Sequence, residues 1–428
     1  MKIKKLNIAS YKHLQDISFD FTYPSNHKDA GKPLKKICII GQSATGKTTI
    51  LELIKQAIRK LESAEIINGI HLFQSFHLSL KGELEFDSIE GTYKVEETRI
   101  SINDRVFSNL PDMGGGAVQK LITENLKLLY ISSELISKEA VNILNQSPQQ
   151  LSADPRIPDF HSLRRKSKTD GYIYEFNQEL NTAIWFYLIY DILEYRQKFT
   201  QLASELINKG LIGNAKKLGD EYERWAQNNK NPLLLFSEKF NQLLNIMNLE
   251  VDLINTEFIV PIKSLYKDEI IPIADLSTGT KSLLLSLLPL FALDTSESII
   301  LIDEPERSLF PDLQIKLIEY YQKIAPEAQF IVVTHSPFIA AAFEPDERFI
   351  MFFNDEGKVS IKKGCSPIGD DPNDILRNDF NIDYNNEFGK EAYQRYLDLK
   401  RKITNETDDA TKKKLIIQIA ELGDKYNF

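Results

Sequence analysis

Residues 41–48 read Gly41-Gln42-Ser43-Ala44-Thr45-Gly46-Lys47-Thr48, and this stretch decides the fold. Its spacing, G-x-x-x-x-G-K-[ST], is that of a loop that wraps the phosphates of a nucleotide. The two glycines let the backbone turn tightly, and a following helix presents N–H donors and partial positive charge. The residues expected to bind the nucleotide here are Gly41, Gln42, Ser43, Ala44, Thr45, Gly46, Lys47, Thr48 and Thr49.

Two side chains of this loop have defined chemistry. Lys47 is expected to reach the β- and γ-phosphates, and the Thr48 hydroxyl is expected to hold Mg²⁺. The apolar run 36–40 predicts a buried strand before the loop, and the apolar spacing over 49–58 predicts a helix after it. Strand, loop and helix therefore follow in the order that the motif requires, which disfavours a chance glycine-rich turn.

Carboxylates and a histidine follow two buried-strand patterns far downstream. The apolar run 298–302 ends in Asp303 and Glu304, and the run 329–334 ends before His335. We expect Asp303 to hold Mg²⁺, directly or through water, and Glu304 to polarise the attacking water. His335 would contact the γ-phosphate or that water. Taken singly, the first feature could be an acidic turn and the second a structural histidine.

A fourth segment, Leu-Ser-Thr-Gly-Thr-Lys at 276–281, precedes the strongly apolar helical run 282–288. Ser277 is a favourable helix N-cap, and Gly279 permits close approach of another backbone. The simpler interpretation is a capped, buried helix. The alternative is a second anion site, which a helix N-terminus presents to a nucleotide held elsewhere.

In this order, the four segments resemble the head of an ATP-binding-cassette (ABC) ATPase. The resemblance is to the branch that contains the SMC proteins, the zinc-hook DNA-repair ATPases, RecF and the OLD-type ATPases, and it covers roughly residues 1–55 and 270–340. It implies an α/β P-loop NTPase fold, with a mixed or parallel sheet, an antiparallel subdomain, a helical insertion and a C-terminal helical tail. It also implies hydrolysis of ATP to ADP and phosphate with Mg²⁺.

The same resemblance implies a head-to-head dimer, or a higher homo-oligomer, with two ATP molecules at the interface. Each ATP would contact one chain through 41–49, Asp303, Glu304 and His335. The other chain would contribute Ser277 and Gly279. A basic residue that matches Lys12 approaches the nucleotide in that branch, and the catalytic roles fall on Lys47, Glu304 and His335.

Some residues depart from the family pattern. The segment 276–281, called the signature segment below, has Thr278 where the family pattern Leu-Ser-Gly-Gly-Gln has its first glycine. The loop expected to contact the other chain of the dimer, 307–311, is like that of RecF and OLD. The residue that completes the Mg²⁺ shell, usually a glutamine, has two candidates. One is Gln74, and the other is the end of the run 128–134.

Composition bounds the class of protein. The 428 residues are 42% apolar and 26% charged, as in an ordinary globular protein of two or three domains. Cys38 and Cys365 lie far apart, which favours a reducing compartment, and the longest apolar runs are too short for a bilayer. With no signal-peptide pattern, we expect a cytoplasmic protein that does not enter the membrane.

The net charge of −9 argues against binding of nucleic acid by the whole surface. Two local basic segments, 164–168 and 28–36, remain candidates for phosphate contacts, with a solvated loop as the alternative for each.

Patterning along the chain predicts four regions: an N-terminal lobe (1–135), a mostly helical insertion (136–255), a C-terminal lobe (256–365) and a helical tail (366–428). Alternation over 77–107 predicts antiparallel strands with turns at 81–82, 90–91 and 103–104. Further expected elements are a strand at 126–132, a helix at 178–207, a hairpin at 349–353 and 358–362, and helices from 371 onward, at 387–402 and at 411–426. The aromatic residues of 178–207 are expected to serve as core or helix–helix contacts, with a platform for nucleobases as the alternative.

The tail resembles the C-terminal helices of ATPases in bacterial anti-phage systems, of the PARIS or Septu type. This resemblance implies a separate effector, a nuclease or toxin, and a trigger that is a nucleic acid or a phage protein. The alternatives are a RecF-like DNA-repair ATPase that binds DNA and a scaffold that binds ATP mainly to assemble. A transporter ATPase fits the Glu-Pro-Glu turn at 304–306 less well.

Overall fold

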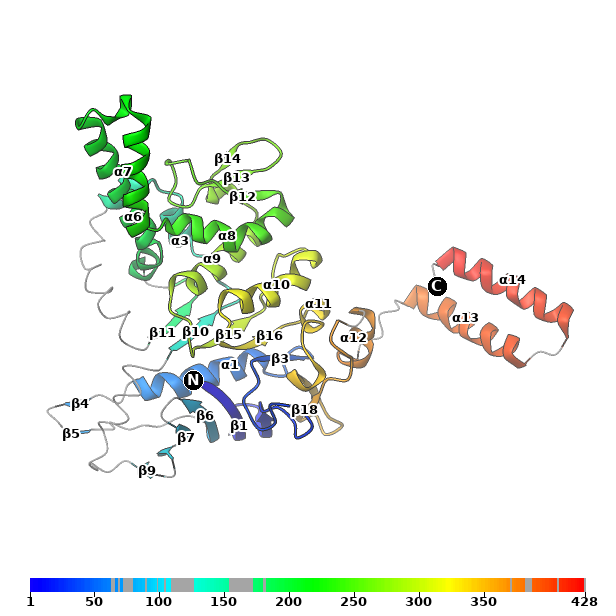
Figure 1. The fold of residues 1–428 in the computed structure, drawn as a ribbon. Helices are drawn as coiled ribbons and strands as arrows, with labels where there is room; N and C mark the ends of the chain where they lie inside the picture. Colours follow the sequence, from blue (N-terminus) through cyan, green and yellow to red (C-terminus); the bar gives the residue numbers. More distant parts are fainter. Residues whose placement is uncertain are drawn as a thin grey trace.

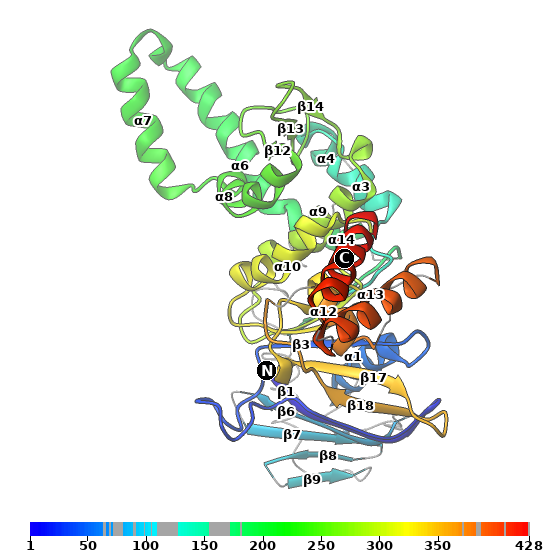
Figure 2. The same ribbon diagram turned by 90° about the vertical axis from the view of Figure 1, so that its right-hand side faces the viewer.

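Two stacked sheets and a layer of helices form the body of the protein (Figures 1 and 2). The computed structural model describes residues 1–62, 66–67, 70–71, 80–88, 91–97, 99–103, 105–108, 127–153, 172–179, 182–369, 372–381, 387–405 and 408–426. The arrangement confirms the predicted α/β class, with a mixed sheet and a separate antiparallel sheet.

The central sheet has seven strands, and all neighbours in it are parallel except the last pair. Their order is β11 (Tyr172–Phe176), β10 (Lys127–Ile131), β15 (Ile299–Asp303), β16 (Gln329–Val333), β3 (Lys36–Gly41), β17 (Arg348–Phe353) and β18 (Val359–Lys363). The predicted strands at 36–40, 126–132, 298–302 and 329–334 are confirmed, as is the hairpin formed by β17 and β18. The strand β11 was not predicted, because it lies inside the insertion that the sequence suggested to be mostly helical.

Side chains of the central strands alternate between two cores. Ile37 and Ile39 of β3 face a core shared with the antiparallel sheet and α1 (Lys47–Glu62). Cys38 and Ile40 of the same strand face the larger core on the other side, among the helices. A strand buried on both faces reads as a continuous apolar run, which is why β3 was recognisable from its sequence.

The antiparallel sheet has six strands in the order β2 (Leu14–Asp20), β1 (Lys2–Tyr11), β6 (Lys81–Ser88), β7 (Gly91–Glu96), β8 (Arg99–Ile102) and β9 (Arg105–Ser108). The turn predicted at 81–82 is wrong, since these residues begin β6 and pair with β1. A Cβ on Gly82 would lie 2.0 Å from the carbonyl oxygen of Asn7, so this glycine permits close strand approach. Asn103 does lie in a turn, between β8 and β9. Gly91 begins β7, and residue 90 lies outside the described residues.

Helices cover the other face of the central sheet (Figure 1). Those packed nearest to it are α9 (Thr278–Ala292), α10 (Pro311–Ile324) and α11 (Pro337–Ala340). Beyond them lie α3 (Lys138–Leu144), α4 (Pro148–Ser152), α6 (Thr182–Asn208), α7 (Ala215–Asn228), α8 (Pro232–Leu244) and a small sheet of β12 (Leu249–Val251), β13 (Ile262–Ser264) and β14 (Ile270–Ile271). Trp185 and Phe186 of α6 are buried, which confirms that its aromatic residues serve mainly as core.

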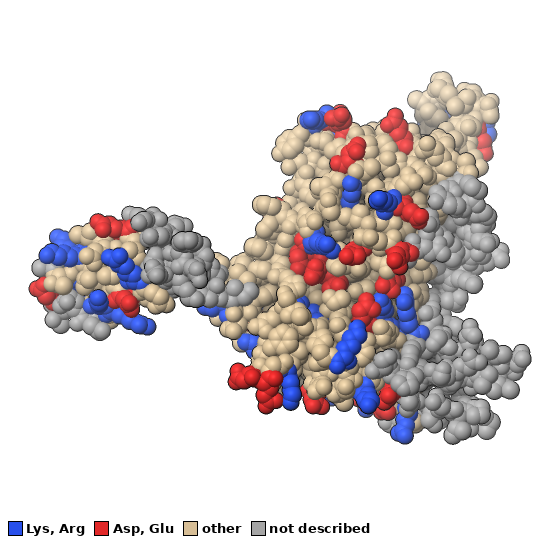
Figure 3. Space-filling model, turned by 180° about the vertical axis from the view of Figure 1, so that it is seen from behind, with Lys and Arg blue, Asp and Glu red and all other residues tan. Residues whose placement is uncertain are grey.

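The C-terminal region contains α12 (Pro372–Asn378), α13 (Glu387–Asn405) and α14 (Asp409–Tyr426), close to the predicted positions. The last two form a hairpin that stands apart from the body in Figure 1. Figure 3 shows Lys and Arg lying among Asp and Glu on this hairpin and on the neighbouring face. Within the described part of the chain, no helix combines the length and apolar character needed to cross a bilayer.

A buried ion pair attaches the end of α12 to the central sheet. Arg348 begins β17, and its Nε lies 2.9 Å from Oδ2 of Asp379; both side chains are fully buried. The other guanidinium nitrogens donate to the carbonyl oxygens of Ala340, Phe343 and Ser366. Burial makes such a pair costly to break, because the remaining charge loses its partner without regaining water.

Replacing Asp379 by Asn is therefore expected to destabilise the protein by about 3–5 kcal/mol. Urea unfolding, followed by circular dichroism, measures this difference. Asp355→Asn, in the exposed turn between β17 and β18, is the matched control and should change stability by less than about 0.5 kcal/mol. Equal stability of the two variants would show that the pair does not hold α12 in place.

Candidate functional site

Three central strands end level with one another, and this brings the candidate site together. In the parallel register Asp303 lies beside Val333, and Val333 lies beside Ile39. The loop 41–48, the carboxylates after β15 and the histidine after β16 therefore meet at one edge of the sheet. Ligands of open α/β sheets bind at this edge, outside the carboxyl ends of the strands.

The glycines of the loop hold backbone shapes that other residues rarely adopt. Gly41 has φ +144°, and a Cβ there would lie 2.0 Å from the carbonyl oxygen of Met351 on β17. Gly46 has φ +94°, and a Cβ there would lie 2.9 Å from Nε2 of His13. The loop is thus confined between β17 and the turn that joins β1 to β2.

Lys47 begins α1 and folds back over the loop. Its Nζ donates to the carbonyl oxygens of Gly41, at 3.1 Å, and Gln42, at 2.8 Å. Burial lowers the pKa of this ammonium, while the nearby carboxylates Glu304 and Asp303 act in the opposite direction. The ammonium group of Lys47 therefore lies against the backbone of the loop, largely shielded from solvent.

Thr48 and Asp303 form the direct link between the two halves of the site. The Thr48 hydroxyl lies 3.2 Å from each carboxylate oxygen of Asp303. Asp303 is 5% exposed, and burial raises its pKa to about 6, with Glu304, Glu306 and Glu52 adding to the shift. A buried carboxylate beside a hydroxyl, with further negative charge around it, suits a small divalent cation.

This donor set fits Mg²⁺. In nucleotide sites Mg²⁺ is usually held by one or two protein oxygens, with phosphate oxygens and water completing the octahedron. Thr48 and Asp303 supply hard oxygen donors of this kind. The residue that would complete the Mg²⁺ shell has the same two candidates as before. Gln74 lies outside the described residues. At the end of the run 128–134, after β10, Ser132 and Ser133 line a small cavity together with Asp303 and Glu304.

Glu304 and His335 face each other across the ends of β15 and β16. Nε2 of His335 lies 3.7 Å from Oε1 of Glu304, and both side chains are partly exposed. Glu304 has φ +48°, a left-handed conformation that is uncommon outside glycine, and its N–H donates to the carbonyl of Val333. Burial, followed by the charge of Lys47, lowers the pKa of His335, while Glu304 acts in the opposite direction; the net shift favours the neutral ring.

Glu306 is a site residue that the sequence analysis missed. Its Oε1 accepts the backbone N–H of His335 at 2.8 Å, and burial raises the pKa of its carboxyl. Glu306 therefore fixes the backbone that carries the histidine. The Glu-Pro-Glu sequence was visible, but only the fold shows that its second carboxylate turns inward. His13, which touches Gly46, was missed too, and no local pattern marks it.

The signature segment lies at the start of α9, as the sequence predicted. Ser277 is the N-cap, and its Oγ accepts the N–H of Thr280 at 3.2 Å. A Cβ on Gly279 would lie 2.1 Å from the carbonyl oxygen of Ser308, so the helix start packs tightly on the loop after Glu306. Ser277 and Gly279 line a cavity of about 420 Å³ with Ser308 and Phe310. The described residues that line it include none of the loop 41–48, nor Asp303 or Glu304.

The structure places Lys12 and one of the two basic segments. Lys12 lies in the turn between β1 and β2, with its Nζ 5.4 Å from the centre of the Tyr11 ring. Its neighbour His13, rather than Lys12, is the residue placed against Gly46. In the segment 28–36, Lys32 pairs with Asp29 and Lys36 with Glu347, which neutralises two of the four lysines. The segment 164–168 lies outside the described residues.

Fold and site together define a P-loop ATPase head. A family profile described as "AAA ATPase domain" matches residues 90–340, more than half of the chain, and the chain therefore belongs to this family. The matched range contains the signature segment, Asp303, Glu304 and His335, and it begins after the loop 41–48. A search of curated proteins found no match to the chain.

Solved SMC heads are among the similar structures. The SMC head bound to the C-winged helix domain of ScpA has 12% identity and a TM-score of 0.42, covering 85% of this chain and 97% of that chain. The SMC head domain from Thermotoga maritima has 14% identity and a TM-score of 0.40, covering 86% and 100%. A third similar structure is the Smc head domain with an extended coiled coil, bound to the C-terminal domain of ScpA derived from Pyrococcus furiosus. It has 14% identity and a TM-score of 0.40, covering 85% of this chain and 96% of that chain.

The raised pKa of Asp303 predicts a pH-dependent cost in stability. Between pH about 4 and 6 the folded chain keeps a proton that the unfolded chain loses, so stability falls as pH rises through this window. Asp303→Asn removes this cost. Without Mg²⁺ and nucleotide, we expect the variant to be more stable than the wild type by about 3 kcal/mol at pH 7.5, and by about half as much at pH 5.

Urea unfolding of both proteins at the two pH values measures this difference, with Asp355→Asn as the control for loss of one exposed carboxylate. A variant that is less stable than the wild type at pH 7.5, or a difference that does not change with pH, would contradict the geometry given for Asp303.

Proposed function

We propose that the chain binds ATP with Mg²⁺ and hydrolyses it to ADP and phosphate. The observation that carries this proposal is the contact between Thr48 and Asp303, two residues 255 positions apart in the sequence. Lys47, Glu304 and His335 lie around this contact. A cation, an Mg²⁺-type ligand pair and a carboxylate that can position water recur in enzymes of phosphoryl transfer.

Binding of the phosphates falls to the loop 41–48 and the start of α1. The N–H groups there point towards the bound anion, and the helix N-terminus adds partial positive charge. Lys47 would exchange its bonds to the carbonyls of Gly41 and Gln42 for bonds to phosphate oxygens. Mg²⁺, held by Thr48 and Asp303, would neutralise charge that develops on the phosphates.

Glu304 and His335, which follow the neighbouring strands β15 and β16, would activate the attacking water. Glu304 would accept a hydrogen bond from the attacking water and thereby orient and polarise it. His335, whose lowered pKa favours the neutral ring, would act as a second hydrogen-bonding group for that water or for the γ-phosphate. Glu306 would be a positioning residue, since it holds the backbone of His335 and has no direct part in the reaction.

The proposal includes a homodimer in which each nucleotide lies between two copies of the chain. The separate cavity that Ser277 and Gly279 line supports it, because these residues lie apart from the loop 41–48 of their own chain. Phe310, on the rim of this cavity, is 73% exposed and offers apolar surface for a partner. In a two-fold dimer, the signature segment of each copy would complete the site of the other.

The biological role that we propose is control of a separate effector, a nuclease or toxin, in bacterial anti-phage defence. The hairpin of α13 and α14, which stands apart from the body, offers surface for such a partner. A nucleic acid or a phage protein would be the trigger. The neighbouring genes discriminate this role from a DNA-repair one: an adjacent nuclease or toxin gene is expected, whereas replication genes would favour a RecF-like function.

Lys47→Ala should abolish measurable ATP binding, because the loop loses the ammonium group that lies against its backbone and would bind the phosphates. Titration with a fluorescent ATP analogue measures the affinity. Lys28→Ala, which removes an exposed lysine, is the matched control and should bind like the wild type. Unchanged affinity of Lys47→Ala would contradict the assignment of the nucleotide site.

Glu304→Gln should bind ATP normally but hydrolyse it slowly, by a factor of about 10² or more, as expected on losing a general base. Because the nucleotide then persists, the variant should accumulate as an ATP-dependent dimer. Phosphate release and light scattering after size exclusion measure the two effects. Glu327→Gln, at an exposed position, is the control. Turnover of Glu304→Gln near the wild-type rate would remove Glu304 from the catalytic role.

A further inference from the structure

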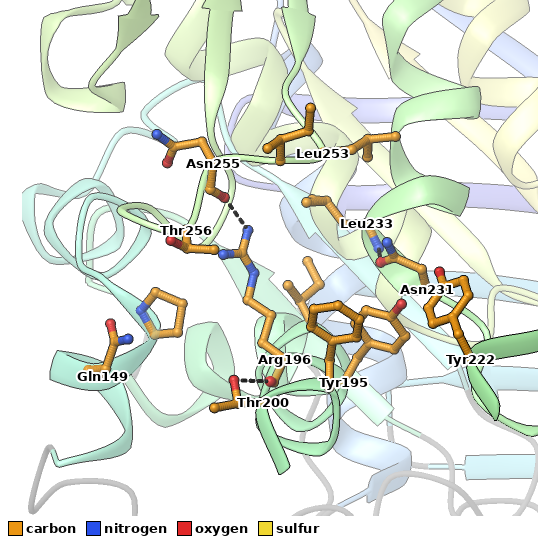
Figure 4. A pocket seen from close by; sticks show the side chains of 14 residues that line it. Gln149, Tyr195, Arg196, Thr200, Tyr222, Asn231, Leu233, Leu253, Asn255 and Thr256 are labelled. Atoms are coloured by element: carbon orange, nitrogen blue, oxygen red, sulfur yellow. Dashed lines mark hydrogen bonds between the residues drawn. The ribbon is translucent and has the colours of Figure 1, made fainter. Parts of the chain in front are cut away.

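A second cavity lies in the helical part of the molecule, apart from the nucleotide site. Its volume is about 440 Å³, in the range of sites that bind small ligands or single side chains. It is enclosed by α4, α6, the side chain of Tyr222 on α7, the start of α8 and the loop 252–256 (Figure 4). Among the described residues that line it are one arginine, several apolar and amide side chains, and no Asp or Glu.

Arg196 gives this cavity its charge. Its Nη2 donates to the carbonyl oxygen of Asn255 at 3.1 Å, which fixes the guanidinium in place, as Figure 4 shows. Its Nη1 is buried and has no hydrogen-bond partner among the described residues. An unused buried donor on a fixed cation is costly unless a ligand completes it. Asp252 acts on Arg196 electrostatically, but its Oδ1 is already occupied by the N–H groups of Ile254 and Asn255.

Aromatic rings form the wall beside Arg196. The rings of Tyr195 and Phe199 are stacked with centroids 6.3 Å apart, and Tyr222 meets Phe199 edge-on at 6.4 Å. Apolar surface continues outward to solvent: Phe199 is 43% exposed, Leu253 43% and Ile254 88%. An apolar rim of this kind around a pocket marks a surface that another molecule covers.

We propose that this cavity docks a peptide segment of another protein, in which an apolar side chain fills the aromatic pocket and an adjacent carboxylate pairs with Arg196. Arginine and tyrosine around a desolvated pocket are the residues that dominate protein–protein contacts. The unpartnered Nη1 of Arg196 can donate to a carboxylate oxygen in a charge-assisted hydrogen bond. A nucleotide fits less well, because the described lining offers a single cation for its phosphates.

The position of this docking site connects it to the ATPase head. α6 carries Tyr195, Arg196 and Phe199, and it packs against α9. Trp185 of α6 and Leu285 of α9 are both fully buried in the same core. α9 in turn begins at the N-cap Ser277. A peptide held on α6 would therefore bind to a helix that packs directly against the signature helix.

The test uses the full-length chain and the dipeptide N-acetyl-leucyl-phenylalanine, as the free acid and as its C-terminal amide. Isothermal titration calorimetry should give millimolar binding of the acid, and at least about tenfold weaker binding of the amide, the size expected for a lost charge-assisted hydrogen bond. Arg196→Met should lower the affinity for the free acid to the affinity that the wild type has for the amide. Lys198→Met, which removes an exposed lysine of the same helix, should leave binding unchanged.

Ile254 provides a matched pair of variants that leaves the fold intact, because its side chain is largely exposed. Ile254→Asp should weaken binding of the acid, and Ile254→Lys should strengthen it, if the carboxylate lies where we place it. Equal affinities for acid and amide, absence of binding to the wild type, or insensitivity to Arg196 would overturn the proposal. So would tighter, Arg196-dependent binding of AMP, which would assign the cavity to a nucleotide. No ATP is present in these titrations, so their outcome is independent of the ATPase proposal.

Discussion

The parallel register of β15, β16 and β3 is the constraint on which the site depends. It places Asp303, Val333 and Ile39 side by side, so that the loop after β3 and the turns after the other two strands meet. A shift of one residue in either pairing would move Asp303 away from Thr48, and would also turn each buried side chain to the opposite core. Burial of the strands on both faces therefore fixes the geometry of the chemical groups at their ends.

Several groups of the candidate site lower the stability of the folded state, and packing elsewhere in the protein has to offset this loss. Asp303 and Glu306 are carboxyl groups whose pKa values burial raises, and Glu304 and Ser308 adopt left-handed backbone conformations. Such features destabilise the folded state, and they concentrate at functional sites. The side chain of Gln314 connects two segments of the site. Its Oε1 accepts a hydrogen bond from the Ser336 hydroxyl, next to His335, and its Nε2 donates to the carbonyl oxygen of Leu309, next to Ser308. Gln314 therefore links the segment that follows His335 to the loop that carries Ser308 and Phe310.

Features with a local pattern could be predicted from the sequence, whereas features that depend on distant contacts could not. The strand before the loop, the helix after it and the N-cap Ser277 follow from apolar spacing and capping chemistry alone. The turn predicted at 81–82 was wrong, because the sequence alone does not distinguish a glycine that permits close approach of two strands, such as Gly82, from a glycine in a turn. β11 was missed because a single short strand in a helical region has no partner in its own neighbourhood. Glu306, His13 and the pair of Arg348 and Asp379 act through residues that only the fold brings near.

Under the proposed function, each nucleotide is bound between the loop 41–48 of one copy and the signature segment of another. Phosphate release from a mixture of two inactive variants, Lys47→Ala and Ser277→Arg, tests this shared site. In a mixed dimer one site carries both substitutions and the other carries neither. We expect recovery of about a quarter of wild-type activity in an equal mixture, since half of the dimers would hold one intact site. A mixture as inactive as its components, or a Ser277→Arg variant as active as the wild type, would contradict it.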